Sequence, residues 1–416
     1  MTHSFDTLAD DDVLTRSRFH FLLKAFYAPA GWPTWLAGVA GAGLATVVAA
    51  LWWLLARDGM LAIAVAGALL AFFAADALLL QELPRRRLSF GPWQGQIAAL
   101  ALPRAAVALS LGLAGLWLGW AAALLLLIAA QGVGSLALYR GALVEPGQLG
   151  LSRLAIRSDR LPPSAPPIRI LHAGDIHLER LSVREAQLLE LAETTQPDLI
   201  LLTGDYVNLS NNVDPETHAQ VRRLLGQLHA RYGVFAVLGT PPVDLHVAIP
   251  PLFDGLPARL LRDEAVAVTL SRGRCLTLLG LDCHHDITRD TATLDRVLAG
   301  APDAGPRVLL YHSPELMLAA AERGIDLYLC GHTHGGQVRL PLIGPLLTAS
   351  QLGRRFVMGH YTRGRTHLYV TRGIGFEGLA APRVRLFCPP EVTLVTLIEE
   401  TSTDFTDYAD SSEDNL

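Results

Sequence analysis

The sequence predicts an all-α bundle of membrane-spanning helices near the N-terminus, followed by a separate α/β domain. Charged residues make up 18% of the 416-residue chain, but they are few between Thr34 and Tyr139. After a proline-rich stretch at residues 161–167, short apolar runs alternate with helical patterns. Long uncharged runs indicate helices that cross a bilayer, and strands that alternate with helices indicate an α/β domain. The length fits two or three domains.

Composition argues against several classes of protein. The net charge is −5 and no basic patch dominates, so we expect no binding to nucleic acid. The four cysteines are scattered without CxxC spacing, which favours neither a zinc ribbon nor a disulfide framework. We expect buried core thiols at Cys275, Cys283, Cys330 and Cys388.

Residues 1–33 form a cytoplasmic arm in this interpretation. The part from Val13 to Phe26 mixes apolar side chains with Arg and Lys, which suits either an amphipathic helix at the membrane surface or a plain juxtamembrane arm. The polar lead is too long and too acidic for the start of a cleaved signal peptide.

Residues 34–140 form the predicted transmembrane region of about four helices. Trp35–Ala56 and Met60–Leu80 each have the ~20 residues that a helix needs to cross a bilayer. The apolar region 96–139 fits two further spans better than one. Three spans in total remain an alternative if Pro103-Arg104 lies outside the hydrocarbon.

Orientation follows from Lys and Arg near the ends of the spans. They gather in the arm, in the second loop and after the last span, whereas the first loop has one and the third has none. Cytoplasmic loops carry the excess of positive charge, so four spans place both termini and the second loop in the cytoplasm. Three spans would place the C-terminal domain outside. The basic residues are Arg16, Arg18, Lys24, Arg57, Arg85, Arg86, Arg87, Arg140, Arg153, Arg157 and Arg160.

Two charges, Asp76 and Arg104, fall within or near predicted spans. Charges inside a membrane protein often have a function. The alternatives are a mutual ion pair or a position at the end of a span.

The remaining chain divides at changes of composition. Residues 141–167 form a proline-rich linker, residues 168–398 the α/β domain, and residues 399–416 an acidic, disordered tail. Predicted strands are Ile168–Ala173, Asp198–Thr203, Gly233–Leu238, Cys275–Leu281, Arg307–Tyr311 and Asp326–Cys330. Predicted helices are Leu181–Ala192, the run from Asp214-Pro215 to Ala230, and the run from Ser313-Pro314 to the residue before Gly324.

Carboxylate and imidazole side chains follow several of these strands. They are Asp175, His177, Asp205, His312, His332 and His334. Ligands of open α/β sheets gather where strands end, so we expect these groups to meet. Their mixture favours Mn, Fe or Zn over Ca or Mg. Two such ions ~3.5–4 Å apart hold a phosphate and activate a water, and we expect one aspartate to bridge them through both its oxygens.

The motifs GDIH at 174–177, GD at 204–205, YHSPE at 311–315 and GHTHGGQ at 331–337 resemble those of the calcineurin-like metallophosphoesterases. The closing segments 371–375 and 388–394 are similar to the bacterial membrane-associated branch of that family. The resemblance covers roughly Arg169 to Ile398. It implies an αββα sandwich of two mixed sheets, with a two-metal site at one edge.

The resemblance also implies a role for each residue. Asp175, His177 and His334 would hold the first metal, Asp205 would bridge, and His312 and His332 would hold the second. Asp205 and His312 would be catalytic. The implied enzyme lies in the bacterial inner membrane. It hydrolyses a phosphomonoester, phosphodiester or pyrophosphate bond of a small-molecule or lipid-linked substrate, using water activated by two divalent ions.

One motif departs from the family pattern. The family places Gly-Asn-His-Asp or Gly-Asn-His-Glu after the third strand, and this chain has Gly239-Thr240-Pro241-Pro242-Val243-Asp244. The second metal therefore loses an Asn ligand, and the transition state loses a His that protonates the leaving oxygen. Replacements from nearby loops are Asp244, His246, His284 and His285, each of which also suits an ordinary loop position.

Two hypotheses follow. The first is an active membrane-anchored phosphoesterase. The second is a metal-binding but catalytically impaired domain that acts as a membrane sensor or scaffold, which the altered motif favours. A four-span transporter with a regulatory domain is a weaker third, because the spans lack paired interrupted helices.

Overall fold

The computed structural model describes residues 27–379 and 381–400, and its contacts divide the chain into two units. Of the described residues, the helical unit contains residues 27–145 together with the segment Gly378–Leu386. The sandwich unit contains Pro146–Glu377 and residues 387–400. The arm segment Val13–Phe26 and the acidic tail beyond residue 400 lie outside the described residues.

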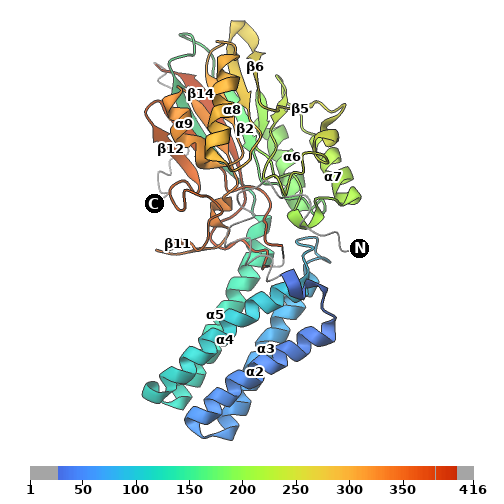
Figure 1. Ribbon diagram of the computed structural model, residues 1–416, viewed down its shortest axis with the longest axis vertical. Coiled ribbons are helices and arrows are strands. Elements are labelled where there is room, and N and C mark those ends of the chain that lie inside the picture. Colours follow the sequence, from blue (N-terminus) through green and yellow to red (C-terminus); the bar gives the residue numbers. More distant parts are fainter. Residues whose placement is uncertain (1–26, 380, 401–416) are drawn as a thin grey trace. The chain divides into compact units, whose positions relative to one another are not determined.

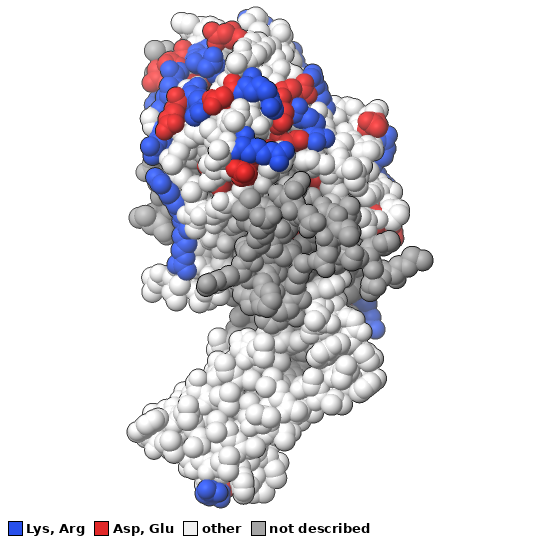
Figure 2. Space-filling model, viewed as in Figure 1, with Lys and Arg blue, Asp and Glu red and all other residues white. Residues whose placement is uncertain are grey.

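Within the described residues, the helical unit has four helices that are long and apolar enough to cross a membrane. They are α2 (Thr34–Ala56), α3 (Gly59–Glu82), α4 (Trp93–Leu118) and α5 (Trp120–Tyr139). This number agrees with the predicted four. Pro103 lies inside α4. The break between α4 and α5 is at Gly119, whose φ of 81° is a backbone conformation that glycine adopts without strain. The surface of this unit in Figure 2 is almost white, because few side chains on it are charged.

Asp76 on α3 and Arg104 on α4 form a buried ion pair. Arg104 donates from Nε and Nη2 to the two carboxylate oxygens of Asp76, at 2.6 and 2.7 Å. The same guanidinium donates from Nη1 to Gln131 Oε1 at 2.8 Å and from Nη2 to Ser135 Oγ at 2.9 Å, both on α5. A bidentate pair with its remaining donors satisfied ties three helices together. Of the alternatives considered for these two charges, the structure shows the mutual ion pair.

A second feature of the helical unit was not predicted. The segment Gly378–Leu386, which the sequence places in the α/β domain, packs with the helices instead. The N–H of Arg385 donates to the carbonyl oxygen of Gly141 at 2.9 Å, and Val384 packs against the cluster that contains Leu83 and Leu138. A nine-residue segment that belongs to the helical unit therefore interrupts the sequence of the α/β domain before β14.

The sandwich unit contains two six-stranded mixed sheets. The first has the order β1-β14-β2-β3-β4-β5 and the second has the order β12-β13-β9-β8-β7-β6. The first sheet contains β1 (Gly150–Ser158), β2 (Ile168–Ala173), β3 (Leu199–Leu202), β4 (Val234–Ala236), β5 (Ala258–Leu260) and β14 (Glu391–Glu399). The second contains β6 (Glu264–Thr269), β7 (Cys275–Gly280), β8 (Arg307–Leu310), β9 (Leu327–Cys330), β12 (Gly359–Arg363) and β13 (Thr366–Val370).

The main apolar core lies between the two sheets. Ile170 of β2, Leu201 of β3, Leu278 of β7 and Leu329 of β9 belong to one buried cluster. The opposite residues of β7, β8 and β9 pack against α8 (Ile287–Ala299) and α9 (Met317–Glu322), while α6 (Val183–Thr195) and α7 (Pro215–Leu225) lie on the other side of the unit (Figure 1). Short alternating strands that are buried on both faces produce this layered arrangement. The predicted αββα sandwich of two mixed sheets is confirmed.

Several boundaries differ from the predicted ones. The expected linker 141–167 contains a π-helical turn (Arg140–Val144) and the edge strand β1, so the sandwich unit starts near residue 146 rather than 168. Strand β1 was missed because three of its nine residues are exposed and three more are only partly buried. Helix α7 ends at Leu225 instead of Ala230. The helix expected after Ser313 begins as a 3₁₀ turn at Pro314–Leu316 before α9. Cys283, Cys330 and Cys388 are buried as expected, whereas Cys275 is partly exposed.

Candidate metal centre

The structure brings the six predicted ligands together at the ends of four strands. Asp175 and His177 follow β2, Asp205 follows β3, His312 follows β8, and His332 and His334 follow β9. All six are buried. Five of them, all except His312, have φ between 43° and 71° in the left-handed region. Side chains other than glycine adopt this region rarely, and such backbone strain gathers at functional sites.

Two glycines make room for the carboxylates. A Cβ on Gly239 would lie 2.1 Å from Asp205 Oδ1, and a Cβ on Gly331 would lie 2.0 Å from Asp175 Oδ2. Both distances are far below any contact between non-bonded atoms. Gly239 and Gly331 therefore allow the ends of neighbouring strands to pack closely around the two carboxylates.

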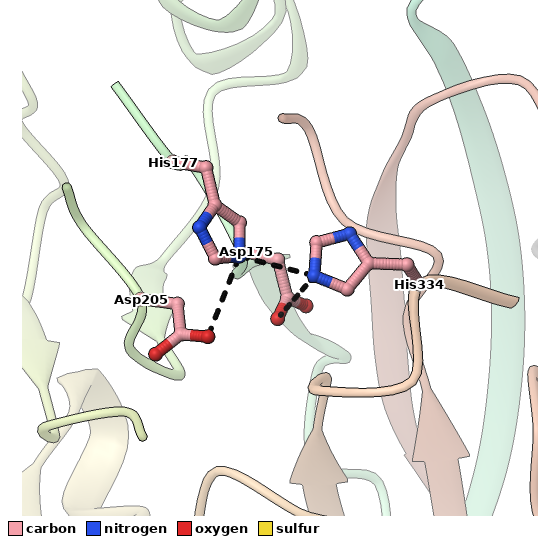
Figure 3. Close-up of side chains that lie close together, drawn as sticks. All are labelled: Asp175, His177, Asp205 and His334. Atoms are coloured by element: carbon pink, nitrogen blue, oxygen red, sulfur yellow. Dashed lines mark hydrogen bonds and ion pairs between the residues drawn. The ribbon is translucent and has the colours of Figure 1, made fainter. Parts of the chain in front are cut away.

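Asp175, His177, Asp205 and His334 form the first group, which Figure 3 shows with their polar atoms turned toward one another. His177 Nε2 lies 3.0 Å from His334 Nε2 and 3.4 Å from Asp205 Oδ2. His334 Nε2 lies 3.6 Å from Asp175 Oδ1. One ligand atom from each of the four residues lies within 4.8 Å of the others, which is the spacing of a shared cation site.

Asp205, His312 and His332 form the second group, so Asp205 belongs to both. Its Oδ2 lies 3.2 Å from His312 Nε2 on one side and 3.4 Å from His177 Nε2 on the other. Its Oδ1 accepts the N–H of Thr240 at 2.7 Å. In this arrangement only Oδ2 faces both groups, and the bridging of two ions by Asp205 stays a prediction.

The hydrogen bonds set which nitrogen of each imidazole is unprotonated. His312 Nδ1 lies 2.7 Å from the carbonyl oxygen of Thr203, to which it must donate, so the Nε2 lone pair of neutral His312 faces Asp205. His177 Nδ1 lies 3.3 Å from Glu377 Oε2, so neutral His177 with its proton on Nδ1 would turn the Nε2 lone pair toward the group. Imidazoles oriented by a carbonyl or a carboxylate behind them are the usual ligands of divalent cations. This donor set fits two such ions.

Electrostatics lead to the same conclusion. Burial alone lowers the pKa of His177, but its hydrogen bonds to Asp205 and Glu377 raise that pKa to about 10. Burial and the neighbouring His312 lower the pKa of His332 to about 4, so His332 is neutral at pH 7. The carboxylates of this centre thus attract positive charge, as a proton or as a divalent cation. The role of the six residues as metal ligands remains a prediction.

Thr240 lies where the family pattern has Asn. Its hydroxyl oxygen is 3.1 Å from His312 Nε2, 3.3 Å from His332 Nδ1 and 3.3 Å from Asp205 Oδ2. The hydroxyl therefore faces all three members of the second group. Pro241, which follows, has no polar side-chain atom, as the sequence indicated.

Of the four replacements considered, Asp244 supports the backbone. Its Oδ2 accepts the N–H groups of Asp205 at 2.7 Å and Gly239 at 2.8 Å, and its Oδ1 accepts the N–H of Tyr206 at 2.9 Å. Burial and the charge of Asp205 raise the pKa of Asp244 to about 7, although these N–H groups act against the shift. Asp244 holds the exits of β3 and β4 together and is not a ligand in this arrangement.

The three histidines differ in position. His284 Nδ1 lies 3.0 Å from Asp290 Oδ1, and His246 packs edge-on against His284. The ring of His285 lies 4.4 Å from that of His332, so it is the histidine that borders the second group. Among the described residues, no hydrogen bond joins these three histidines to the six predicted ligands.

Sequence reasoning missed Glu377. It fixes His177 from behind, and its Oε2 also accepts the N–H of Leu209 at 2.9 Å. Gln337, three residues after His334, donates to the carbonyl oxygen of Glu377 at 2.8 Å and accepts its N–H at 2.6 Å. Glu377 is two hundred positions from His177, so no spacing rule could have joined them.

An αββα sandwich whose strand ends carry buried carboxylates and imidazoles in two groups that share one aspartate defines the class of calcineurin-like phosphoesterases, and the chain belongs to that family. The family model "Calcineurin-like phosphoesterase" matches residues 168–239.

Among individual relatives, the chain is 31% identical over 261 residues to the phosphodiesterase YaeI of Escherichia coli K12, covering 61% of this chain and 90% of that protein. It is 29% identical over 260 residues to the metallophosphoesterase YkuE of Bacillus subtilis, covering 61% of this chain and 87% of that protein. A bovine protein described as a transmembrane protein with metallophosphoesterase domain is 29% identical over 259 residues, which cover 57% of this chain and 54% of that protein.

Proposed function

We propose that the protein is an active phosphoesterase, anchored in a membrane by α2–α5, that uses two divalent ions of Mn, Fe or Zn. Bound there, such ions would neutralise phosphoryl oxygens and lower the pKa of a water for attack on phosphorus. The observation that carries the proposal is the position of Asp205 Oδ2, 3.2 Å from His312 Nε2 and 3.4 Å from His177 Nε2. A buried carboxylate oxygen placed between two imidazole nitrogens supports a site for two cations.

Within this proposal, each group of residues has a separate task. Asp175, His177 and His334 hold one ion, His312 and His332 hold the other, and Asp205 contacts both. Thr240 supplies a hydroxyl oxygen to the second group, since it already lies within 3.3 Å of Asp205, His312 and His332. A neutral hydroxyl is a weaker ligand than a carboxylate or an imidazole, so we expect the second ion to bind less tightly than the first.

The altered motif also narrows the substrate. Pro241 cannot give a proton to the leaving oxygen, and help of this kind is worth ~10²–10⁴ in rate. An alkyl phosphomonoester needs that proton because an alkoxide is a strong base. A pyrophosphate bond, or a phosphodiester with an aryl group, leaves as a weaker base and needs it less. We therefore expect a pyrophosphate or an activated phosphodiester, small or lipid-linked, as the substrate.

The test uses the full chain in detergent, loaded with Mn²⁺, with metal content and hydrolysis measured in the same preparation. We expect about two ions per chain, and faster hydrolysis of a pyrophosphate and an aryl phosphodiester than of an alkyl phosphomonoester. Asp205→Asn should reduce hydrolysis to background and lower the metal content. Thr240→Val, which removes only the hydroxyl, should lower occupancy of the second ion and leave the first in place.

The alternative function is a metal-binding sensor or scaffold without catalysis, and Pro241 is the observation that favours it. Background hydrolysis of all three substrates by a chain that carries two ions would establish this alternative. Equal hydrolysis by the parent chain and Asp205→Asn would refute the two-ion mechanism.

The membrane location is also a proposal. Four spans with Arg85, Arg86 and Arg87 in the second loop support a location of the sandwich unit in the cytoplasm, on the inner face of a bacterial inner membrane. Protease accessibility of the sandwich unit in inside-out and right-side-out vesicles tests the orientation, and cleavage only in right-side-out vesicles would reverse it.

A further inference from the structure

A short hairpin of the sandwich unit exposes an unusual set of apolar side chains. Strands β10 (Arg339–Leu340) and β11 (Gly344–Pro345) pair antiparallel and enclose the turn Pro341-Leu342-Ile343. In Figure 1 the hairpin that carries β11 projects from the sheets of this unit. Relative exposures are 108% for Leu342, 57% for Ile343, 47% for Leu346 and 59% for Leu347. An apolar cluster of this kind marks a surface that binds a partner or a membrane.

Leucine is an unfavourable choice at the tip in two respects. Leu342 has a φ of 67°, in the left-handed region that glycine or asparagine occupies at lower cost. Its side chain is also fully exposed to water. Neither feature stabilises the sandwich unit, so the reason for a leucine here lies in what the tip contacts.

The hairpin is fixed to the loop that carries the predicted ligand His334. The N–H of Leu346 donates to the carbonyl oxygen of Val338 at 3.1 Å, and Arg339 Nη1 donates to the carbonyl oxygen of Gly335 at 3.0 Å. A Cβ on Gly336 would lie 2.4 Å from Pro345 Cβ, so the loop and the hairpin are in close contact. A partner that binds the tip is therefore connected, through the hairpin and the loop that precedes it, to the predicted ligand His334.

The charged residues in the sequence around the tip are of one sign. From Leu327 to Met358 the sequence has no Asp or Glu and three arginines, Arg339, Arg354 and Arg355. Arg354 and Arg355 are exposed, and Arg354 Nη1 donates to the carbonyl oxygen of Ile343 at 3.0 Å, which places its charge beside the turn. Apolar side chains with arginines next to them match a bilayer surface, where acyl chains lie below anionic headgroups.

We propose that the hairpin Arg339–Leu347 inserts its apolar tip into the lipid leaflet on the side of the sandwich unit, with Arg354 and Arg355 at the headgroups. The inference rests on the proposed membrane anchoring and is independent of hydrolysis. It supplies a second membrane contact, from the catalytic unit itself, beside the ligand loop. Each exposed arginine strengthens attachment to an anionic surface about fivefold.

The test places a fluorescent probe on the tip of the full chain in nanodiscs that contain spin-labelled lipid. Cys275→Ser removes the cysteine that is not buried, and Leu342→Cys carries the probe. Val247→Cys, at a site 78% exposed in the same unit, is the matched control, and Leu125→Cys, 69% exposed on α5, reports the membrane anchor. We expect quenching by lipid at positions 342 and 125 and none at 247.

A second arm tests the headgroup contact. Replacing anionic by zwitterionic lipid should weaken quenching at position 342 several-fold, and Arg354→Gln with Arg355→Gln should remove this dependence on lipid charge. Quenching at 125 without quenching at 342 overturns the proposal while leaving the anchor intact. A probe at 342 that is shielded from water but not quenched by lipid shows that protein covers the tip, which also overturns it. Absence of quenching at 125 refutes the membrane anchoring itself.

Discussion

Asp244 offers the sharpest test of how the strand ends are held. Its carboxylate accepts three backbone N–H groups, from Asp205, Tyr206 and Gly239, in a fully buried position. The substitution Asp244→Asn keeps one acceptor oxygen, which can still take the two N–H groups at Oδ2. The amide NH₂ that replaces Oδ1 then faces the N–H of Tyr206, donor against donor.

The expected loss of stability follows from the number of backbone N–H groups that each substitution leaves without an acceptor. A buried donor left without a partner costs about 1–3 kcal/mol, so Asp244→Asn should destabilise the loop by that amount. The same energy corresponds to local opening that is about 5- to 150-fold more frequent. Asp244→Ala leaves all three donors unpaired, at a cost of about 3–9 kcal/mol, which rivals the 5–15 kcal/mol of a whole domain.

Hydrogen exchange of the full chain, followed by mass spectrometry, measures this opening. At pH 8, above the pKa of about 7 for Asp244, the peptide that spans residues 203–208 should exchange faster in Asp244→Asn, while peptides of β8 keep their rate. Asp254→Asn, the same change at an exposed position, is the matched control and should have no effect. Unchanged exchange of residues 203–208 in Asp244→Asn would show that the carboxylate does not hold this loop.

Three further outcomes are expected. Glu377→Gln should weaken Mn²⁺ binding ~10–100-fold, because His177 loses the carboxylate that orients it, and a metal titration with unchanged affinity would remove Glu377 from the site. Asp76→Asn should destabilise the helical unit by ~3–5 kcal/mol by leaving the Arg104 charge buried without its partner, and the pair Asp76→Leu with Arg104→Leu should recover most of this loss in thermal unfolding; equal loss in both proteins would contradict the argument. Burial lowers the pKa of His172 to about 3. The contribution of neutral His172 to the free energy of unfolding is therefore complete above pH 6.5 and is lost as the pH falls toward 3. Between pH 6.5 and pH 5 this amounts to about 2 kcal/mol, which denaturant unfolding should detect in the parent and not in His172→Gln.

The sequence predicted those helices and strands whose residues are apolar along almost their whole length, because such runs can be identified without knowing what they pack against. The apolar runs around Trp35–Ala56 and Met60–Leu80 correspond to α2 and α3 within a few residues. The run Ile168–Ala173 coincides with β2 because all its members but one are buried. Strand β1 escaped prediction because only three of its nine residues are buried and its place is set by pairing with β14 far along the chain.

The candidate site was predictable in its membership but not in its geometry. Histidine and aspartate after consecutive strands identified the six side chains, since parallel strands bring their ends to one edge. Which oxygen of Asp205 faces both groups depends on the N–H of Thr240, and no pattern of residue types encodes that bond. Sequence reasoning did not find Glu377 and named Asp244 only as a possible replacement ligand, because both residues act through contacts with other segments of the chain.

The pairing of β1 also has a consequence for biosynthesis. Gly150 of β1 lies opposite Glu391 of β14, so about 240 residues separate the two partners. At ~5–20 residues per second, a ribosome needs ~12–48 s to make the second strand after the first. During that interval β1, which follows α5 along the chain, lacks its partner strand. Cleaving the chain between residues 158 and 168 should therefore yield a fragment in which β14 keeps β2 but lacks β1, so that β14 exposes an open edge and the fragment aggregates edge to edge.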